Sequence, residues 1–372
     1  MSKIRCAVIG TSHGMAHIVQ VLRHPRLELA AVCNSSSKTL DYLRGEAVPE
    51  DLESVTFSAP RAELIRRARR YPELQSARFV RDFQAVLDLP DVDAVILAVP
   101  VCLNGVFAAQ ALRAGKHVLA EKPLAINEEQ GADLVRAVKT SGRAFVLSYG
   151  HRRSPLMRKI RQIIDSGELG DVRQMWWTMH RMPFRPAHSK LEISGGAFVS
   201  ECCHWFDLFD YFQGGGAQFS RVASFGGLDV VADQNFADNA VTIIEYTSGV
   251  RASLNYAYFV DQPEYKTFGI AGTKGKLRGD TDRAGQFVMY SGATKNRTEF
   301  VVNPETAHTG HLGFDLVHED LVAQIEGDRG EAIAEAERGL ENLRLCLAAQ
   351  EALDSGRIVE RSEAARRWID PR

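Results

Sequence analysis

The stretch that decides the fold is Ile4-Arg5-Cys6-Ala7-Val8-Ile9-Gly10-Thr11-Ser12-His13-Gly14-Met15-Ala16-His17. Its first six residues have the pattern of an apolar strand, and a helical pattern begins at Gly14. Glycines at such a junction allow a tight turn and let a diphosphate approach the amino end of the helix. The match to G-x-G-x-x-G is imperfect, because Ser12 stands at the second glycine position and Gly14 comes one residue early. The turn therefore indicates either a dinucleotide-binding loop or a plain strand-helix connection.

The same alternation of strand and helix continues through Tyr149, which is typical of a parallel sheet. The predicted strands are Ile4–Ile9, Leu27–Cys33, Ala94–Val99, His117–Ala120 and Ala144–Tyr149. The predicted helices are Gly14–Arg23, Asp82–Leu87, Asn104–Ala114 and Glu128–Ser141. Right-handed crossovers of this kind predict an α/β fold with a doubly wound sheet.

The pattern changes after Tyr149. A helix is predicted over Pro155–Ser166 and a strand over Val172–Thr178. Residues 221–272 then carry β-branched and aromatic runs broken by turns, which favours an antiparallel sheet. A last helix is predicted over Glu331–Ser355. We therefore expect two domains, residues 1–150 and residues 151–372.

Composition limits the class of protein. The chain has 372 residues and a formal net charge of −2, which argues against a dedicated nucleic-acid binder. A strand predicted from Ile4 leaves no room for a signal peptide, and the longest apolar run, Ala94–Leu103, is too short to span a bilayer. The six cysteines have neither disulfide-framework nor zinc-ribbon spacing. We expect a cytoplasmic protein without a membrane partner.

Residues 45–77 interrupt the alternation with three prolines and a basic helical stretch, Arg61 to Arg70. One interpretation is a surface insertion whose arginines are solvated. The other is a patch that binds an anion or a partner. The sequence does not decide between them.

The stretch Ala114–Pro123 contains an apolar strand that stops abruptly at Glu121-Lys122-Pro123. In an open α/β sheet, ligands bind beyond the carboxyl ends of the strands. A lysine placed there can be desolvated and tuned to exchange a proton with a bound alcohol or ketone. Lys122 is therefore a candidate catalytic residue.

The residues after the second strand usually determine which dinucleotide binds. An acidic residue there would hold the ribose 2′-hydroxyl of NAD, and its loss can admit the 2′-phosphate of NADP. The chain has neutral Asn34 at this place, followed by Ser35 and later by Lys38, whose charge could counter a phosphate. This favours NADP over NAD. The alternative is that Asn34 simply caps the next helix.

A second dense segment runs from Gly195 to Asp207. If it is helical from about residue 199, then Ser200, His204 and Asp207 share one face. A histidine so placed can act as a general acid/base or hold a substrate hydroxyl. Glu201 and His204 also have spacing that could suit a metal, but no second ligand cluster is visible, so we expect no metal site.

The chain resembles the glucose-fructose oxidoreductase, inositol dehydrogenase and rhizopine-catabolism family (Gfo/Idh/MocA). The resemblance rests on the glycine-containing first turn, Glu121-Lys122-Pro123, Tyr149–Pro155, Gly195–Asp207, Gly272-Thr273-Lys274-Gly275 and the His308–Asp315 turn. It runs essentially from end to end.

The resemblance implies a Rossmann domain followed by an α/β domain with a large, mostly antiparallel sheet, often used as an oligomer interface. It implies NAD(P)-dependent oxidation or reduction of sugars, inositols and related polyols. By position, Lys122 matches the catalytic lysine of the family and His204 its active-site histidine, and Pro123 matches a proline that helps to fix the turn.

The chain departs from the family pattern at two places besides the first turn. Ser200 stands where the family often has an aspartate four residues before the histidine, with Glu201 one step along. Asn104 stands where the family often has a histidine after the fourth strand.

From these observations we expect an oxidoreductase that transfers a hydride between NAD(P) and a carbohydrate or polyol. The expected catalytic residues are Lys122, His204 and Ser200. The expected cofactor contacts are Gly10, Thr11, Ser12, His13, Gly14, Met15, Asn34, Ser35, Lys38, Val99, Pro100, Asn104, Glu121 and Lys122. The expected substrate contacts are Lys122, Arg152, His180, Arg181 and His204. We expect a homo-oligomer, a dimer or a tetramer.

Two other functions remain open at this point. One is a non-catalytic NAD(P)-binding metabolite sensor, which the loss of the aspartate at Ser200 motivates. The other uses the cofactor for transient oxidation within a net hydrolysis or elimination.

Overall fold

The computed structural model describes residues 2–50, 52, 59–260, 264–280, 286–292, 295–301 and 313–362. They fall into two compact units. The first comprises Met1–Ala125, Gln130–Ser148 and Asp315–Glu337, and the second comprises Ile126–Glu129, Tyr149–Phe314 and Arg338–Arg372. The expected division at residue 150 stays a prediction about domains. The units differ from it mainly in Asp315–Glu337, which belongs to the first.

The first unit contains a six-stranded parallel sheet in the order β3-β2-β1-β4-β5-β6. Its strands are β1 (Ile4–Ile9), β2 (Leu27–Cys33), β3 (Arg78–Val80), β4 (Ala94–Leu97), β5 (His117–Glu121) and β6 (Phe145–Ser148). The strand order reverses between β1 and β4, which is where such sheets bind dinucleotides. The predicted doubly wound fold is confirmed.

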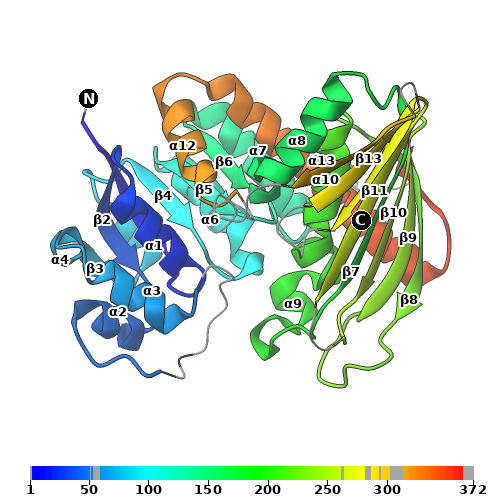
Figure 1. Ribbon diagram of the computed structural model, residues 1–372. Helices are drawn as coiled ribbons and strands as arrows, with labels where there is room; N and C mark the ends of the chain where they lie inside the picture. The colour runs from blue at the N-terminus through cyan, green and yellow to red at the C-terminus, as the bar shows by residue number, and fades with distance from the viewer. Residues whose placement is uncertain are drawn as a thin grey trace. The chain divides into compact units, whose positions relative to one another are not determined.

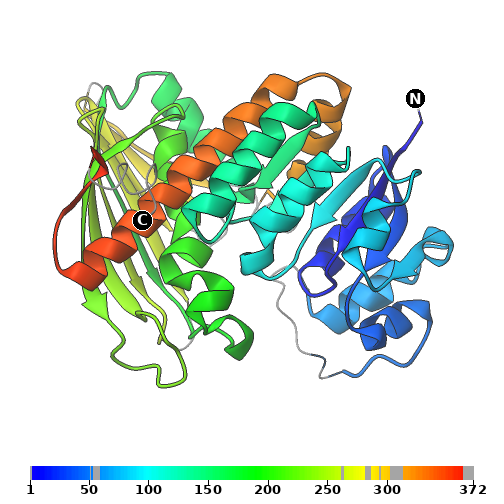
Figure 2. The same cartoon turned by 180° about the vertical axis from the view of Figure 1, so that it is seen from behind.

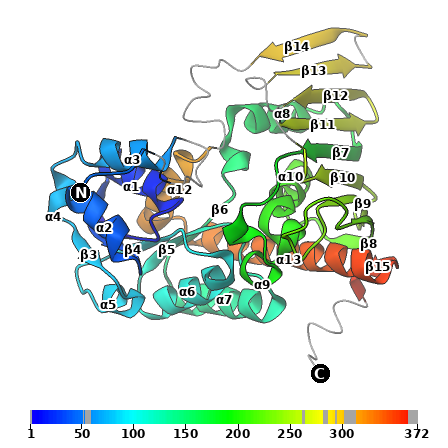
Figure 3. The same cartoon turned by 90° about the horizontal axis from the view of Figure 1, so that it is seen from below.

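Helices cover both faces of this sheet, as Figure 3 shows for the first unit. On one side lie α1 (Gly14–Arg23), α3 (Arg61–Ala68) and α12 (Leu316–Glu326). On the other lie α5 (Phe83–Leu87), α6 (Val101–Arg113) and α7 (Glu128–Ser141), of which α6 and α7 stand in front in Figure 2. The short helices α2 (Ser37–Arg44) and α4 (Glu73–Ser76) follow the second strand. Because both faces are covered, the central strands β1 and β4 are almost wholly buried.

The second unit is built on a nine-stranded mixed sheet, mostly antiparallel, in the order β14-β13-β12-β11-β7-β10-β9-β8-β15 (Figures 1 and 3). Its strands are β7 (Val172–His180), β8 (Phe219–Gly227), β9 (Asn239–Tyr246), β10 (Arg251–Ala257), β11 (Tyr265–Gly272), β12 (Gly275–Asp280), β13 (Gln286–Ser291), β14 (Arg297–Val301) and β15 (Val359–Glu360). One pair, β7 with β10, is parallel.

The helical segments of the second unit are η1 (Gly150–Arg153), α8 (Pro155–Asp165), η2 (Pro186–His188), α9 (Leu191–Ser194), the π-helix Phe198–Cys202 and α10 (Cys203–Phe212). The last helix, α13 (Arg329–Ser355), contributes residues to both units. Helices α8 and α10 lie on one face of the sheet (Figure 3). Side chains on this face form an aromatic core, in which the rings of Trp177 and Phe268 stack with centroids 4.9 Å apart.

Several element boundaries differ from the predictions. Helix α6 begins at Val101 rather than at Asn104, because Pro100 supplies an extended residue just before the first turn. Strand β3 and helix α12 were not predicted. In the described part of the chain, no helix is both long and apolar enough to cross a membrane.

Candidate functional site

The turn after β1 passes directly against the end of β4. Gly10 has φ +90°, and a Cβ at this position would lie 2.1 Å from the carbonyl oxygen of Ala98. No other residue type fits both the dihedral angle and the space. The backbone can therefore approach the switch point of the sheet closely, which is what a dinucleotide-binding turn requires.

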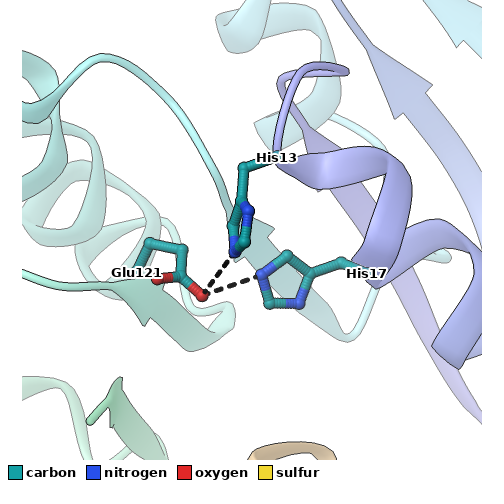
Figure 4. Close-up of side chains that lie close together, drawn as sticks. All are labelled: His13, His17 and Glu121. Carbon is teal, nitrogen blue, oxygen red and sulfur yellow. Dashed lines mark hydrogen bonds and ion pairs between the residues drawn. The ribbon is translucent and has the colours of Figure 1, made fainter. Parts of the chain in front are cut away.

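Three side chains meet beside this turn (Figure 4). His13 and His17 lie one helical turn apart at the start of α1, and Glu121 ends β5. Glu121 Oε1 lies 3.1 Å from His17 Nε2 and 3.6 Å from His13 Nε2. His17 Nδ1 lies 3.0 Å from His318 Nε2. When His17 carries its proton on Nε2, its Nδ1 can accept a hydrogen bond from the Nε2–H of His318, which fixes the orientation of the His17 ring.

The electrostatics of this group keep the carboxylate ionised. Burial tends to raise the pKa of Glu121, but the imidazoles of His13 and His17 outweigh it and hold that pKa well below its usual range. Burial lowers the pKa of His17, which is fully buried. A neutral His17 can still donate its Nε2–H to the carboxylate.

The same three side chains could also ligate a cation, since one ligand atom from each lies within 4.8 Å of the others. Two imidazoles and a carboxylate are a ligand set that zinc accepts. The direct bonds to Glu121 account for the grouping without an ion, and the expectation of no metal site stays a prediction.

Lys122 follows this group at the carboxyl end of β5 and is half-buried. The Lys122–Pro123 peptide bond is cis. On helix α6, the buried side-chain amide of Asn104 donates to the carbonyl oxygens of Glu121 and of Pro123, the latter at 3.0 Å. Asn104 thus fixes the backbone on both sides of Lys122, a role that its sequence position did not reveal.

The turn after β2 carries the expected cofactor contacts Asn34, Ser35 and Lys38. Helix α2 begins at Ser37 with Ser36 as its N-cap, so Asn34 is not the capping residue. Asn34 Nδ2 instead donates to the carbonyl oxygen of Ser36 at 3.3 Å. The guanidinium of Arg81 donates to the Ser35 carbonyl from Nε at 3.2 Å and from Nη2 at 3.1 Å, so the turn lies beside a positive charge.

In the second unit, the segment before α10 does not form the regular helix that the sequence pattern predicted. Phe198–Cys202 is a π-helix, in which the Cys203 N–H donates to the Phe198 carbonyl five residues back. Ser200 is buried and its hydroxyl donates to the Gly196 carbonyl at 2.7 Å. The structure therefore occupies the Ser200 hydroxyl with the backbone and leaves Glu201 and His204 partly exposed.

His204 lies in an aromatic setting built by Tyr149 and His151. The His204 ring packs edge-on against His151, with centroids 4.6 Å apart, and against Tyr149 at 6.2 Å. Trp205 tilts against His151 at 5.0 Å. The sequence reasoning did not consider His151, although it stands within the Tyr149–Pro155 stretch.

Two residues predicted to contact substrate, Arg181 and Arg152, form ion pairs with acidic side chains. Arg181 Nη1 lies 2.7 Å from Glu201 Oε2, and Arg181 Nε lies 3.1 Å from Glu264 Oε1. Lys266 pairs with the same Glu264 at 2.8 Å. His180, also predicted to contact substrate, lies partly exposed with its ring 5.7 Å from that of Tyr265.

Arg152 forms a forked ion pair with Asp207, which lies one turn after His204 on α10. Arg152 Nε lies 2.6 Å from Asp207 Oδ2, and Arg152 Nη2 contacts the other carboxylate oxygen. Burial raises the pKa of Asp207 to about 6 although Arg152 opposes that shift. Arg152 is therefore engaged in an ion pair with α10, the helix that carries His204.

Comparison with known proteins identifies the family. The family model "Oxidoreductase family, NAD-binding Rossmann fold" matches residues 4–150, and the model "GFO/IDH/MocA C-terminal domain" matches residues 157–278. The chain belongs to the Gfo/Idh/MocA family. The resemblance seen in the sequence is thereby confirmed, and this is a family of NAD-dependent oxidoreductases.

Two curated relatives of this Gfo/Idh/MocA protein are dehydrogenases of carbohydrates and polyols. Levoglucosan dehydrogenase from Pseudarthrobacter phenanthrenivorans is 24% identical over 62% of this chain and 65% of its own length. The scyllo-inositol 2-dehydrogenase (NAD(+)) of Bacillus subtilis is 28% identical over 48% of this chain and 52% of its own length.

A solved structure of levoglucosan dehydrogenase in complex with NADH and L-sorbose has the same fold. Its TM-score is 0.74 at 20% identity, covering 97% of this chain and 99% of that chain. At this identity the likeness establishes the architecture of the Gfo/Idh/MocA protein.

Proposed function

We propose that this Gfo/Idh/MocA protein transfers a hydride between NAD(P) and a sugar, an inositol or a related polyol. The observation that carries the proposal is Lys122, an ammonium at the carboxyl end of β5 whose flanking backbone is fixed by Asn104. Polyhydroxylated substrates are named for two relatives, levoglucosan dehydrogenase and scyllo-inositol 2-dehydrogenase.

The residues of the first unit fit a dinucleotide. Gly10 leaves room for close approach at the switch point, and the amino end of α1 faces the same place. Gly10 to Met15 would hold the diphosphate, and the residues after β2 and β4 would hold the ribose and the nicotinamide sides. When bound, the nicotinamide supplies the hydride acceptor or donor.

Lys122 handles the proton of the reacting hydroxyl in this proposal. During oxidation its neutral Nζ accepts the hydroxyl proton as the hydride leaves, and during reduction its ammonium returns that proton. His204 would hydrogen-bond the same hydroxyl and orient it. The pairing of Lys122 with His204 rests on the family resemblance.

The finer features are also proposals. Asn34 offers no carboxylate for a ribose 2′-hydroxyl, and Lys38 and Arg81 place positive charge near it, which supports a preference for NADP over NAD. Strands β8 and β9 carry three large apolar side chains that are at least half exposed, namely Phe225, Val241 and Ile243. This exposure supports an oligomer formed through the sheet of the second unit. We place the protein in the cytoplasm.

A single assay tests the proposed activity. The protein is mixed with NADP⁺ or NAD⁺ and a panel of polyols, and absorbance of the reduced cofactor is followed. Net reduction is expected with at least one polyol. Product release without net reduction would favour hydrolysis or elimination, and cofactor binding without any reaction would favour a sensor.

The role of Lys122 is tested on the substrate so found. Lys122→Ala should lower kcat by at least about a hundredfold, because general acid/base catalysis contributes that much. Lys139→Ala, which removes an exposed lysine from α7, is the matched control and should leave kcat unchanged. Near-wild-type turnover of Lys122→Ala would overturn the assignment.

A further inference from the structure

Arg61 links the turn that follows β1 to the first turn of helix α2, which comes after β2. It is the first residue of α3, in the segment between β2 and β3. Arg61 Nε donates to the Thr11 carbonyl at 3.0 Å, and Nη2 lies 2.9 Å from the hydroxyl of Thr39 and 3.4 Å from that of Thr11. Both threonines are buried, at 1% and 6% exposure. One guanidinium therefore bonds three polar groups, two on Thr11 in the turn after β1 and one on Thr39 in helix α2.

The place of Arg61 on its helix is unfavourable by local rules. A helix favours negative charge at its amino end, because the free N–H groups there carry partial positive charge. A cation at the first residue of α3 opposes that preference. The contacts with Thr11 and Thr39 compensate for it, and a local conflict of this kind is typical of a functional position.

The turn after β1 has no permanently charged cation of its own. Residues 10–18 contain no lysine and no arginine. A dianionic diphosphate at this turn would meet backbone N–H groups and the amino end of α1. Arg61 brings a permanent positive charge to Thr11, in the middle of the same turn, from a segment that sequence analysis could not interpret.

We propose that Arg61 is a positioning residue for the dinucleotide. It holds Thr11, and with it the turn Gly10–Gly14, in the shape that receives the diphosphate, and it adds positive charge beside that group. The proposal rests on the proposed function. Because NAD and NADP share the diphosphate, losing Arg61 weakens the binding of both to the same extent.

The neighbouring arginines of α3 provide a comparison. Arg67 pairs with Glu63 on the same helix, and Arg66 lies 4.0 Å from Glu50; both side chains are about half exposed. They form the solvated basic face that one interpretation of residues 45–77 predicted. Arg67→Ala removes the same charge as Arg61→Ala from the same helix without touching either turn.

The experiment measures dissociation constants for NADP⁺ and NAD⁺ by calorimetric titration of the full chain. Arg61→Ala should weaken both by about tenfold or more, as expected for the loss of charge-assisted hydrogen bonds. Arg61→Lys should recover part of the loss, since lysine keeps the charge but lacks the planar fork. Arg67→Ala should stay within about twofold of wild type.

Kinetics and a second variant separate positioning from a general loss of structure. In Arg61→Ala the KM for the cofactor should rise about tenfold while kcat changes far less, because the hydride is transferred at the other end of the cofactor. Thr39→Val removes one acceptor without changing shape or charge, and should weaken both cofactors by a few-fold. If Arg61→Ala does not fold, the cofactor affinities of Thr39→Val test the proposal in its place.

Three results would overturn the proposal: wild-type affinity in both Arg61→Ala and Thr39→Val, a loss confined to NADP⁺, or an equal loss in Arg67→Ala. Wild-type protein that binds neither cofactor would instead overturn the proposed function, and this inference with it.

Discussion

The side-chain amide of Asn104 lies 3.0 Å from the carbonyl oxygen of Pro123. The same nitrogen also donates to the carbonyl of Glu121, so the two bonds bracket Lys122. The position of the lysine ammonium therefore depends on an amide from the neighbouring helix as well as on the strand that carries it.

We expect Asn104→Ala to impair catalysis more than folding. Loss of the two bonds should lower the free energy of unfolding by about 1–3 kcal/mol. It should lower kcat by about ten- to a hundredfold, because small displacements of a catalytic group are costly. Denaturant titration and steady-state kinetics measure both effects, with exposed Gln110→Ala on the same helix as the control. A stability loss with unchanged kcat would leave Asn104 only a structural role.

Removing Arg152 should destabilise the second unit by an amount that depends on pH, because Arg152 pairs with the buried carboxylate of Asp207. Arg152→Ala leaves a carboxylate whose side chain is only 2% exposed. The free energy of unfolding at pH 7 should fall by about 3–5 kcal/mol. Burial raises the pKa of Asp207 to about 6 even though Arg152 opposes that shift, and removing Arg152 takes away this opposition. The folded variant therefore takes up this proton more readily than the unfolded chain. The penalty should therefore shrink as the pH falls from about 7 to about 5.

Urea titrations of wild type and Arg152→Ala at both pH values measure this effect. The double variant Arg152→Ala/Asp207→Asn removes the buried charge and should recover much of the loss at pH 7. A penalty of equal size at both pH values, or no recovery in the double variant, would contradict the explanation.

The buried imidazole of His117 should make the stability of the first unit fall at acid pH. Burial, together with the charges of Arg143 and Arg329, lowers the pKa of His117 to about 4 from its ordinary value of 6.5. Its Nδ1 accepts the Ala144 N–H at 2.9 Å, so the folded state requires that nitrogen to be unprotonated. As the pH falls, the unfolded chain binds this proton first. The stabilisation is complete above about pH 6.5 and is lost progressively toward about pH 4.

The full loss corresponds to about 3 kcal/mol at 1.36 kcal/mol per pKa unit. Denaturant titrations between about pH 7.5 and pH 4.5 should show this dependence in wild type. His117→Asn keeps an acceptor near the Nδ1 position but does not titrate, so its stability should vary less over the same range. Equal pH profiles for the two proteins would refute the role of His117.

The sequence predicted the first unit well because its signals are local. The apolar run that ends at Glu121 defines both β5 and the place of Lys122, and the turn at Gly10 follows the first strand directly. Strand β3 escaped prediction because it is three residues long, with no pattern to detect.

The side-chain partners could not be predicted because they come from distant parts of the chain. Arg152 and Asp207 are 55 residues apart, and Arg181 lies 20 and 83 residues from its two glutamates. A charged residue considered without its partners looks free to bind substrate. The direction expected for the Ser200 side chain assumed an ordinary α-helix, whereas residues 198–202 form a π-helix, and its catalytic role stays a prediction.

The π turn at Phe198–Cys202 also bears on how this site could change during evolution. A wide turn accommodates one more residue than an α-helical turn between the same ends. Deleting one codon there would close the wide turn to an α-helical turn and shift the residues within it by one position relative to His204. The side chain bordering the histidine could thus be exchanged by a length change alone. Alignments of relatives across residues 198–202 should therefore allow a one-residue offset.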